Sequence, residues 1–124
     1  MQEQKIYGRR EGAVGHIVFN NPAKPNAVSL DMWDGFVGLL KDYEADPEVR
    51  CVVVSGAGGK AFVSGADISK FADERSSKDG VEKYNKAVEL GYSTVYSFPK
   101  PTIAMIRGYC IGGGMGLASC CDIR

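Results

Sequence analysis

Residues 106–124 read IRGYCIGGGMGLASCCDIR, and this stretch decides the fold. Between its apolar flanks it holds four glycines within five residues: Gly112, Gly113, Gly114 and Gly116. Glycine accepts backbone conformations and close approaches that a side chain would exclude. The pattern predicts a tight turn leading into a short helix over residues 112–120. The apolar run before it, TIAMI at residues 102–106, predicts a buried strand.

The same layout occurs once more, earlier in the chain. The run CVVVS at residues 51–55 predicts a buried strand, and the glycine-rich GAGGKAFVSGADISKF follows it at residues 56–71, turning helical near Asp67. The N–H groups at a helix start have no partner within the helix, and the helix dipole favours negative charge there. Two such turns side by side would aim two N–H groups at one oxygen, which is an oxyanion hole made of backbone. Tight packing of helix against strand is the alternative explanation for these glycines.

The rest of the chain alternates strands and helices. Strands are expected at residues 4–9 and 14–20. A first helix is expected to begin at Leu30, capped by Ser29, and to end at Asp46-Pro47. It carries one apolar stripe: Trp33, Phe36, Val37, Leu40 and Tyr43.

A second helical stripe runs from Val81 to Tyr96, after a polar loop at residues 73–80, and residues 121–124 resemble the start of another strand. Strands that alternate with helices predict an α/β fold with parallel pairing and right-handed crossovers. The sequence shows no internal repeat and no second domain.

Composition excludes several classes of protein. The 124 residues contain 15 Lys and Arg against 15 Asp and Glu, so the chain lacks the basic surplus of a nucleic-acid-binding domain. It has no apolar run long enough to span a membrane, and its polar first residues do not form a secretory signal. The four cysteines form no C-x-x-C pair, a spacing that does not suit a zinc site, so we expect buried reduced thiols and no metal. They are Cys51, Cys110, Cys120 and Cys121.

Two well-known glycine loops do not fit. A P-loop would need glycine at the position of Val54, five residues before Gly59, and Ser or Thr at the position of Ala61. The dinucleotide fingerprint would need glycine at the position of Leu117. A serine hydrolase site is also disfavoured, because Ser64 and Ser119 have no suitable histidine partner.

Three segments, in order, resemble the N-terminal half of the crotonase superfamily, the enoyl-CoA hydratases and isomerases. They are NNPAKPNA at residues 20–27, KAFVSGADI at residues 60–68 and GYCIGGGMGLA at residues 108–118. The resemblance implies a crotonase-like ββα spiral, also called the ClpP/crotonase fold. It also implies that residues 1–124 are the N-terminal part of a single crotonase-like domain whose C-terminal half is absent.

The resemblance implies an acyl-CoA-binding enzyme that stabilises a thioester enolate. The backbone N–H groups of Ala66 and Gly113 would form its oxyanion hole. Its implied substrate-binding residues are Lys24, Ala27, Ser64, Ala66, Asp67, Ile68 and Gly113. Some hydratases place a lysine near the CoA phosphates at the position of Ser69; the adjacent Lys70 is either its substitute or a solvated helix residue. Coenzyme A is part of the substrate, so no separate cofactor and no metal are expected. The family further implies a homotrimer or hexamer without nucleic-acid or membrane partners, located in the cytoplasm, or in the mitochondrial matrix if a transit peptide is removed.

One position departs from the family pattern. Hydratases carry glutamate two residues after the glycine triplet, whereas this chain has Gly116, which cannot transfer a proton. The departure weakens the case for hydration and leaves acyl-CoA binding intact. It favours an alternative function, a non-catalytic acyl-CoA-binding or assembly subunit.

Other groups are weaker candidates for acid–base work. Asp73, Glu74 and Glu82 border the polar loop and are interpreted as solvated. His16 is expected in a strand far from both glycine turns. Tyr84 and Tyr92 are interpreted as packing residues.

Overall fold

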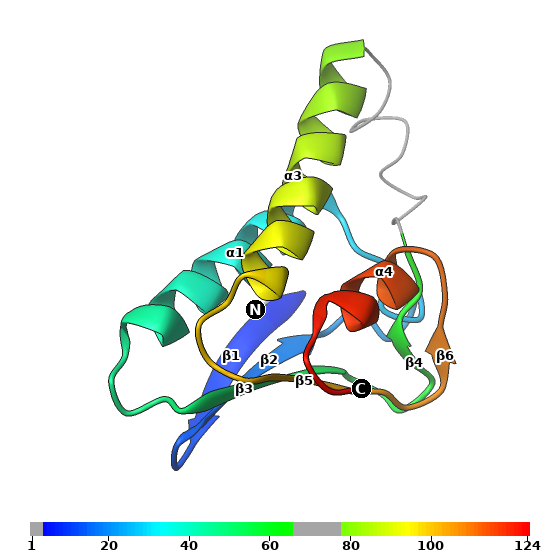
Figure 1. Ribbon diagram of the computed structural model, residues 1–124. Helices are drawn as coiled ribbons and strands as arrows, with labels where there is room; N and C mark the ends of the chain where they lie inside the picture. The colour runs from blue at the N-terminus through cyan, green and yellow to red at the C-terminus, as the bar shows by residue number, and fades with distance from the viewer. Residues whose placement is uncertain (1–3, 66–77) are drawn as a thin grey trace.

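The computed structural model describes residues 4–65 and 78–124. A four-stranded sheet in the order β1-β2-β3-β5 lies below the helices, and a two-stranded sheet, β4-β6, stands beside it near α4 (Figure 1). The strands are β1 (Ile6–Glu11), β2 (Val14–Phe19), β3 (Cys51–Gly56), β4 (Ala61–Val63), β5 (Thr102–Met105) and β6 (Tyr109–Cys110). The helices are α1 (Leu30–Ala45), α3 (Lys78–Tyr96) and α4 (Gly113–Cys120).

The topology follows the alternation of strands and helices in the sequence. β1 and β2 form an antiparallel hairpin, while β2, β3 and β5 pair in parallel, as predicted. In this register Ile17 lies beside Val54, and Val54 lies beside Ala104. All three side chains are buried and face the helices, so the centre of the sheet forms the floor of the core.

The predicted apolar stripe of α1 forms the middle of the core. Trp33 and Phe36 pack edge-on with ring centroids 6.2 Å apart, and Phe36 packs on Phe19 of β2 at 5.3 Å. α3 lies across α1 at Gly91, where a Cβ atom would stand only 2.8 Å from the Trp33 ring. A glycine at this crossing therefore lets α3 approach α1 closely. The turn of α3 that follows Gly91 packs against α4.

Several local expectations need correction. Residues 78–80 are helical and belong to α3, because the helix begins before its apolar stripe does. β1 runs over residues 6–11 and not 4–9, in register with all of β2. Ser29 precedes α1, but its side chain makes no capping hydrogen bond. Residues 121–124 contribute a single bridge, Ile123 to Ile103, and no full strand.

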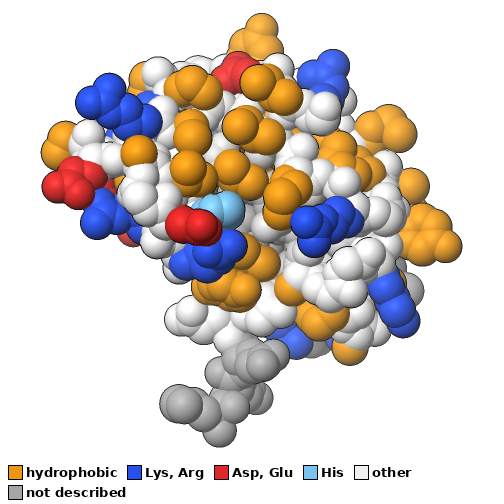
Figure 2. Space-filling view, turned by 90° about the horizontal axis from the view of Figure 1, so that it is seen from below, with side chains coloured by type: hydrophobic (Ala, Val, Ile, Leu, Met, Phe, Trp, Pro, Cys, Tyr) orange, Lys and Arg blue, Asp and Glu red, His pale blue; other side chains and the backbone are white. Residues whose placement is uncertain are grey.

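The face of the large sheet opposite the helices carries His16 at the edge of a group of apolar side chains, next to an acidic and a basic side chain (Figure 2). Because Ile17 and Phe19 of β2 point into the core, His16 points the other way. Burial and the neighbouring Arg9 lower the pKa of His16, against an opposing effect of Glu11. His16 thus lies on the wrong face of the sheet to serve a site near the glycine turns, as expected from the sequence.

The cysteines differ in burial more than the sequence suggests. All four are free thiols, but only Cys121 is buried, whereas the other three are half-buried. Burial raises the pKa of Cys121 to about 11, so its thiol stays protonated near neutral pH. Among the helices described, none is long and apolar enough to cross a membrane.

Candidate functional site

The two glycine-rich turns lie side by side. Gly65 follows β4 with φ +115°, and Gly112 precedes α4 with φ +52°, both conformations that favour glycine. A Cβ atom on Gly113 would stand 3.5 Å from the Cα of Gly65, and a Cβ atom on Gly65 would stand 3.7 Å from the Gly113 nitrogen. The juxtaposition predicted from the sequence is therefore present in the fold.

The small β4-β6 sheet brings the two turns together. Ala61 pairs with Tyr109, Val63 pairs with Cys110, and the Tyr109 N–H donates to the Lys60 carbonyl at 3.0 Å. Gly108 makes this approach feasible, because a Cβ atom there would lie 2.0 Å from the Lys60 carbonyl oxygen. Neither short strand was expected from the sequence, because two or three residues are too few to show a periodic pattern.

The members of the glycine triplet have different roles. A Cβ atom on Gly114 would lie 1.8 Å from the Val63 carbonyl oxygen, so close packing of α4 on β4 requires glycine there. A Cβ atom on Gly113 would have only ordinary contacts, the nearest at 3.5 Å. Tight packing thus explains Gly114 but does not explain Gly113, where a Cβ atom would fit with ordinary contacts.

Gly113 begins α4 and offers a hydrogen-bond donor. The N–H of Gly114 donates to Ile111 at 2.9 Å, and the N–H of Gly116 donates to Gly112 at 3.2 Å. Within residues 4–65 and 78–124, no backbone acceptor is recorded for the Gly113 N–H. No side chain caps the helix at Gly112 either. The start of α4 therefore presents an N–H group and the positive end of a helix dipole toward Gly65.

The loop at residues 20–27 supports the other turn. Asn26 is fully buried, its amide donates to the carbonyls of Ala57 (2.9 Å) and Ala61 (2.8 Å), and its Oδ1 accepts from the Asn21 N–H (2.8 Å). The Val28 N–H then donates to the Gly65 carbonyl at 2.7 Å. These bonds hold the end of β4 against the loop.

The predicted ligand-binding residues differ in burial, and some of them lie outside the described residues. Lys24 is exposed on the loop, and its carbonyl accepts from the N–H of buried Ala27 at 3.0 Å. Ser64 is half-buried beside Gly65. Glu82 is exposed on α3. The remaining candidates lie outside the described residues: Ala66, Asp67, Ile68, Lys70, Asp73 and Glu74.

Tyr92 is the site residue that sequence reasoning missed. Its ring packs edge-on against Trp33 with centroids 5.6 Å apart, as a packing residue would. Its hydroxyl, however, donates to the Gly113 carbonyl at 3.1 Å, inside the glycine turn. A glycine in the middle of a helix often marks a close neighbour. Gly116 is such a glycine, and the neighbour is Tyr92, so Gly116 was the sequence signal for this contact.

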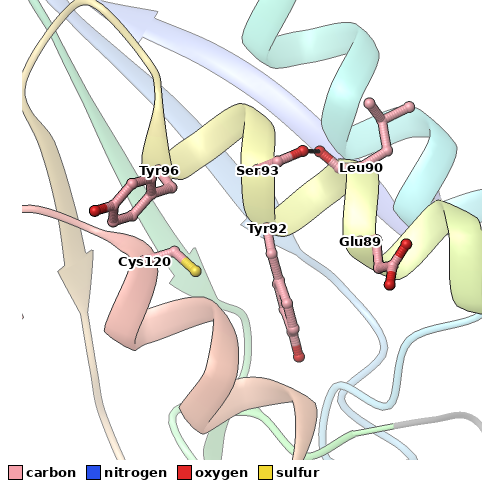
Figure 3. A pocket seen from close by; sticks show the side chains of 6 residues that line it. All are labelled: Glu89, Leu90, Tyr92, Ser93, Tyr96 and Cys120. Atoms are coloured by element: carbon pink, nitrogen blue, oxygen red, sulfur yellow. Dashed lines mark hydrogen bonds between the residues drawn. The ribbon is translucent and has the colours of Figure 1, made fainter.

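A cavity of about 670 Å³ opens between α3 and α4 next to this turn. In Figure 3, Tyr92 points from α3 toward the first turn of α4, and the Cys120 thiol lies between the two helices. The cavity lining is mainly apolar, and its residues are Glu89, Leu90, Tyr92, Ser93, Tyr96 and Cys120. It is broadly open to solvent, and its lining comes from α3 and from Cys120 of α4. Burial raises the pKa values of both Tyr92 and Cys120, so both groups stay neutral near pH 7.

No cluster of three or more His, Cys, Asp or Glu side chains that could hold a metal ion occurs among the described residues. The glycine turns offer hydrogen-bond donors: the backbone N–H of Gly113 and the Tyr92 phenol. A polarised oxygen of a bound ligand is the natural acceptor for such donors.

Comparisons with known proteins agree with this geometry. Residues 9–124 match the family model described as enoyl-CoA hydratase/isomerase. The chain is 38% identical to the mitochondrial Delta(3,5)-Delta(2,4)-dienoyl-CoA isomerase of Mus musculus, with 88% of this chain and 36% of the relative covered. It is 33% identical to the short-chain-enoyl-CoA hydratase of Clostridium acetobutylicum, with 100% of this chain and 47% of the relative covered.

Solved structures show the same likeness. The crystal structure of an enoyl-CoA hydratase/carnithine racemase from Magnetospirillum magneticum superposes with a TM-score of 0.91 at 39% identity, covering 99% of this chain and 46% of that one. The α/β fold class expected from the sequence, that of the crotonase-like structures, is thereby confirmed. The chain spans less than half the length of these relatives.

Proposed function

Because the chain belongs to the enoyl-CoA hydratase/isomerase family, we propose that it binds an acyl-CoA thioester and stabilises the enolate of that thioester with two backbone N–H groups. The donors are the amides of Ala66 and Gly113. The observation that carries the proposal is the contact between the two glycine turns, where the Gly65 Cα lies 3.5 Å from the position of a Cβ atom on Gly113.

The start of α4 suits the Gly113 donor to this task. A carbonyl oxygen that accepts from its N–H would also lie at the positive end of the α4 dipole. Negative charge develops on this oxygen as the thioester becomes an enolate, so both effects are stronger in the transition state than in the ground state. Loss of one such donor typically costs about 3–4 kcal/mol in the transition state.

The second donor is supported by the groups around it. The peptide unit that contains the Ala66 nitrogen also contains the Gly65 carbonyl, and the Val28 N–H bonds that carbonyl at 2.7 Å. We propose that Lys24, Ala27, Ser64, Asp67 and Ile68 bind the coenzyme A portion beside this turn. Val28 follows Ala27 directly in the chain. The hydrogen bond from the Val28 N–H to the Gly65 carbonyl therefore holds the loop that carries Lys24 and Ala27 next to Gly65.

Gly116 makes enolate chemistry without hydration the better candidate reaction. Hydration needs acids and bases that place and activate water, and glycine supplies neither at this position. Isomerisation needs a proton to leave one carbon and return to another, which one base can perform. The curated relatives bear names of both kinds, hydratases and dienoyl-CoA isomerases.

A second candidate function is an acyl-CoA-binding or assembly subunit without catalysis. The absence of a carboxylate at position 116 favours it. Exchange of the α-protons of butyryl-CoA with D2O, followed by NMR, separates the two functions. An enolate-forming enzyme exchanges these protons, whereas a binding subunit binds butyryl-CoA and leaves the protons in place.

Binding of a thioester analogue tests the oxyanion hole itself. Calorimetry compares butyryl-CoA with the thioether in which CH2 replaces the carbonyl. Two lost hydrogen bonds, each worth about 0.5–1.5 kcal/mol, predict that the thioether binds more weakly by roughly 5- to 150-fold. Equal affinities for the two compounds would mean that the glycine turns do not hold the carbonyl oxygen.

A further inference from the structure

The Tyr92 hydroxyl lies at the glycine turn, yet the two-amide oxyanion hole makes no use of it. The three atoms nearest to a Cβ atom on Gly113 would be the Gly65 Cα at 3.5 Å, the Tyr92 hydroxyl at 3.6 Å and a carbon of the Trp33 ring at 4.0 Å. The polar side-chain group among these three nearest neighbours is the Tyr92 phenol.

The phenol also fills the space of a missing side chain. A Cβ atom on Gly116 would lie 2.5 Å from the Tyr92 hydroxyl oxygen and 2.8 Å from its Cζ. A side chain at position 116 would therefore force the Tyr92 ring to move. The edge-on contact with Trp33 and the hydrogen bond to the Gly113 carbonyl hold the ring in this place.

We propose that the Tyr92 phenol donates a hydrogen bond to the enolate of the bound thioester, from the place that a side chain at position 116 would otherwise occupy. The proposal rests on the proposed function, because it takes the thioester to bind at Gly113. Tyr92 then adds a side-chain donor to the two backbone donors and touches the substrate directly.

The phenol acts as a donor and keeps its proton. Burial raises the pKa of Tyr92, so removal of its proton is harder than from a tyrosine in water. On binding, the O–H turns from the Gly113 carbonyl to an oxygen of the ligand, and no covalent bond forms or breaks. The Gly113 carbonyl remains in the first turn of α4, where the helix's own hydrogen-bond pattern supplies a donor.

The test uses acetoacetyl-CoA, a β-ketothioester whose enolate has its own near-ultraviolet absorption. Titration of the bound compound gives the apparent pKa of its enolisation without reference to any catalytic base. Donors that face the enolate lower this pKa. A charge-assisted hydrogen bond is worth roughly 1.5–3 kcal/mol, so Tyr92→Phe should raise the pKa of bound acetoacetyl-CoA by about one to two units.

A matched control comes from the same cavity. Tyr96 lies one turn further along α3 and is 78% exposed, so Tyr96→Phe removes a phenol from the lining without touching Gly113. We expect the bound pKa in this variant to equal that of the unaltered protein. Tyr92→Met, which also lacks the hydroxyl, provides the same comparison if the phenylalanine variant does not fold.

The outcomes separate the two proposals. If the unaltered protein binds acetoacetyl-CoA but does not lower its pKa below the value in water, the proposed oxyanion hole is wrong. If the protein lowers the pKa and Tyr92→Phe leaves it unchanged, the oxyanion hole stands and Tyr92 is a packing residue only. A rise confined to the Tyr92 variants supports the phenol as an enolate donor.

Discussion

The Val63 carbonyl oxygen lies 1.8 Å from the point where a side chain on Gly114 would begin. The neighbouring Gly113 has no contact of this kind, since its nearest neighbour would lie 3.5 Å away. Adjacent glycines of one triplet thus differ in purpose. Gly114 allows α4 to pack against β4, whereas packing does not require glycine at position 113, where we propose that the backbone N–H binds the ligand.

Gly114→Ala should destabilise the protein strongly, because a backbone carbonyl cannot move aside as the end of a side chain can. Overpacking typically costs about 1–3 kcal/mol, and we expect the upper end or more of that range in the free energy of unfolding, measured by urea denaturation. Gly38→Ala is the matched control. Its Cβ atom meets nothing within 4 Å in the middle of α1, so it should stabilise the protein by about 1 kcal/mol.

Gly113→Pro should leave the fold intact and reduce enolate formation. Proline is well tolerated at the first position of a helix, and it lacks the N–H that we assign to the oxyanion hole. The rate of α-proton exchange of butyryl-CoA should fall by roughly 10²–10³-fold. Met115→Ala, on an exposed residue of the same turn, should exchange at the normal rate. A folded Gly113→Pro variant with normal exchange would remove Gly113 from the site.

Gly116→Glu alone should fail to install hydratase activity, although the sequence by itself suggests that it would restore the family's glutamate. The new side chain would collide with Tyr92, at a cost of about 1–3 kcal/mol in the free energy of unfolding. Combined with Tyr92→Ala, the same substitution should cost much less. A double-mutant cycle measured by denaturation should therefore show a coupling of at least about 1 kcal/mol, and simple additivity of the two changes would contradict the contact.

Asn26→Ala should destabilise the protein by about 2 kcal/mol or more. It removes the donor from two carbonyls, those of Ala57 and Ala61, and each buried unsatisfied group costs about 1–3 kcal/mol. Its φ of +55° is also unfavourable for alanine. Thermal unfolding measures the loss. Asn20→Ala serves as control, because the Asn20 side chain donates to the Gln4 carbonyl in an exposed position, and we expect a change within about 0.5 kcal/mol.

Alkaline pH should destabilise the protein partly through Cys121. Its pKa in the folded protein is about 11, against 9.0 as the ordinary value, so the unfolded chain loses this proton first. The contribution of Cys121 to stability is therefore constant below pH 9 and declines as the pH rises from 9 to about 11. Cys121→Ala should show a shallower decline over this window, seen in urea midpoints taken at each pH. Identical pH profiles for the two proteins would mean that Cys121 ionises equally in both states.

The sequence predicted those parts of the fold that depend on local pattern. The apolar stripe of α1, the buried runs of β3 and β5 and the two glycine turns all follow from spacing along a single segment. The contact between Tyr92 and Gly116 could not be predicted in this way, because it joins two helices and depends on how Gly91 lets α3 approach α1. β4 and β6 are held by backbone pairing across nearly fifty residues, which leaves no periodic signal in either strand.

The clash between Tyr92 and any side chain at position 116 means that the residues at these two positions should co-vary in evolution. In this chain, a carboxylate at position 116 requires the Tyr92 ring to shift or a smaller residue to replace Tyr92. We expect relatives to divide accordingly, with an aromatic residue accompanying glycine and a smaller residue accompanying an acid. Counting these pairs across aligned relatives would then sort them by reaction type before any enzyme is assayed.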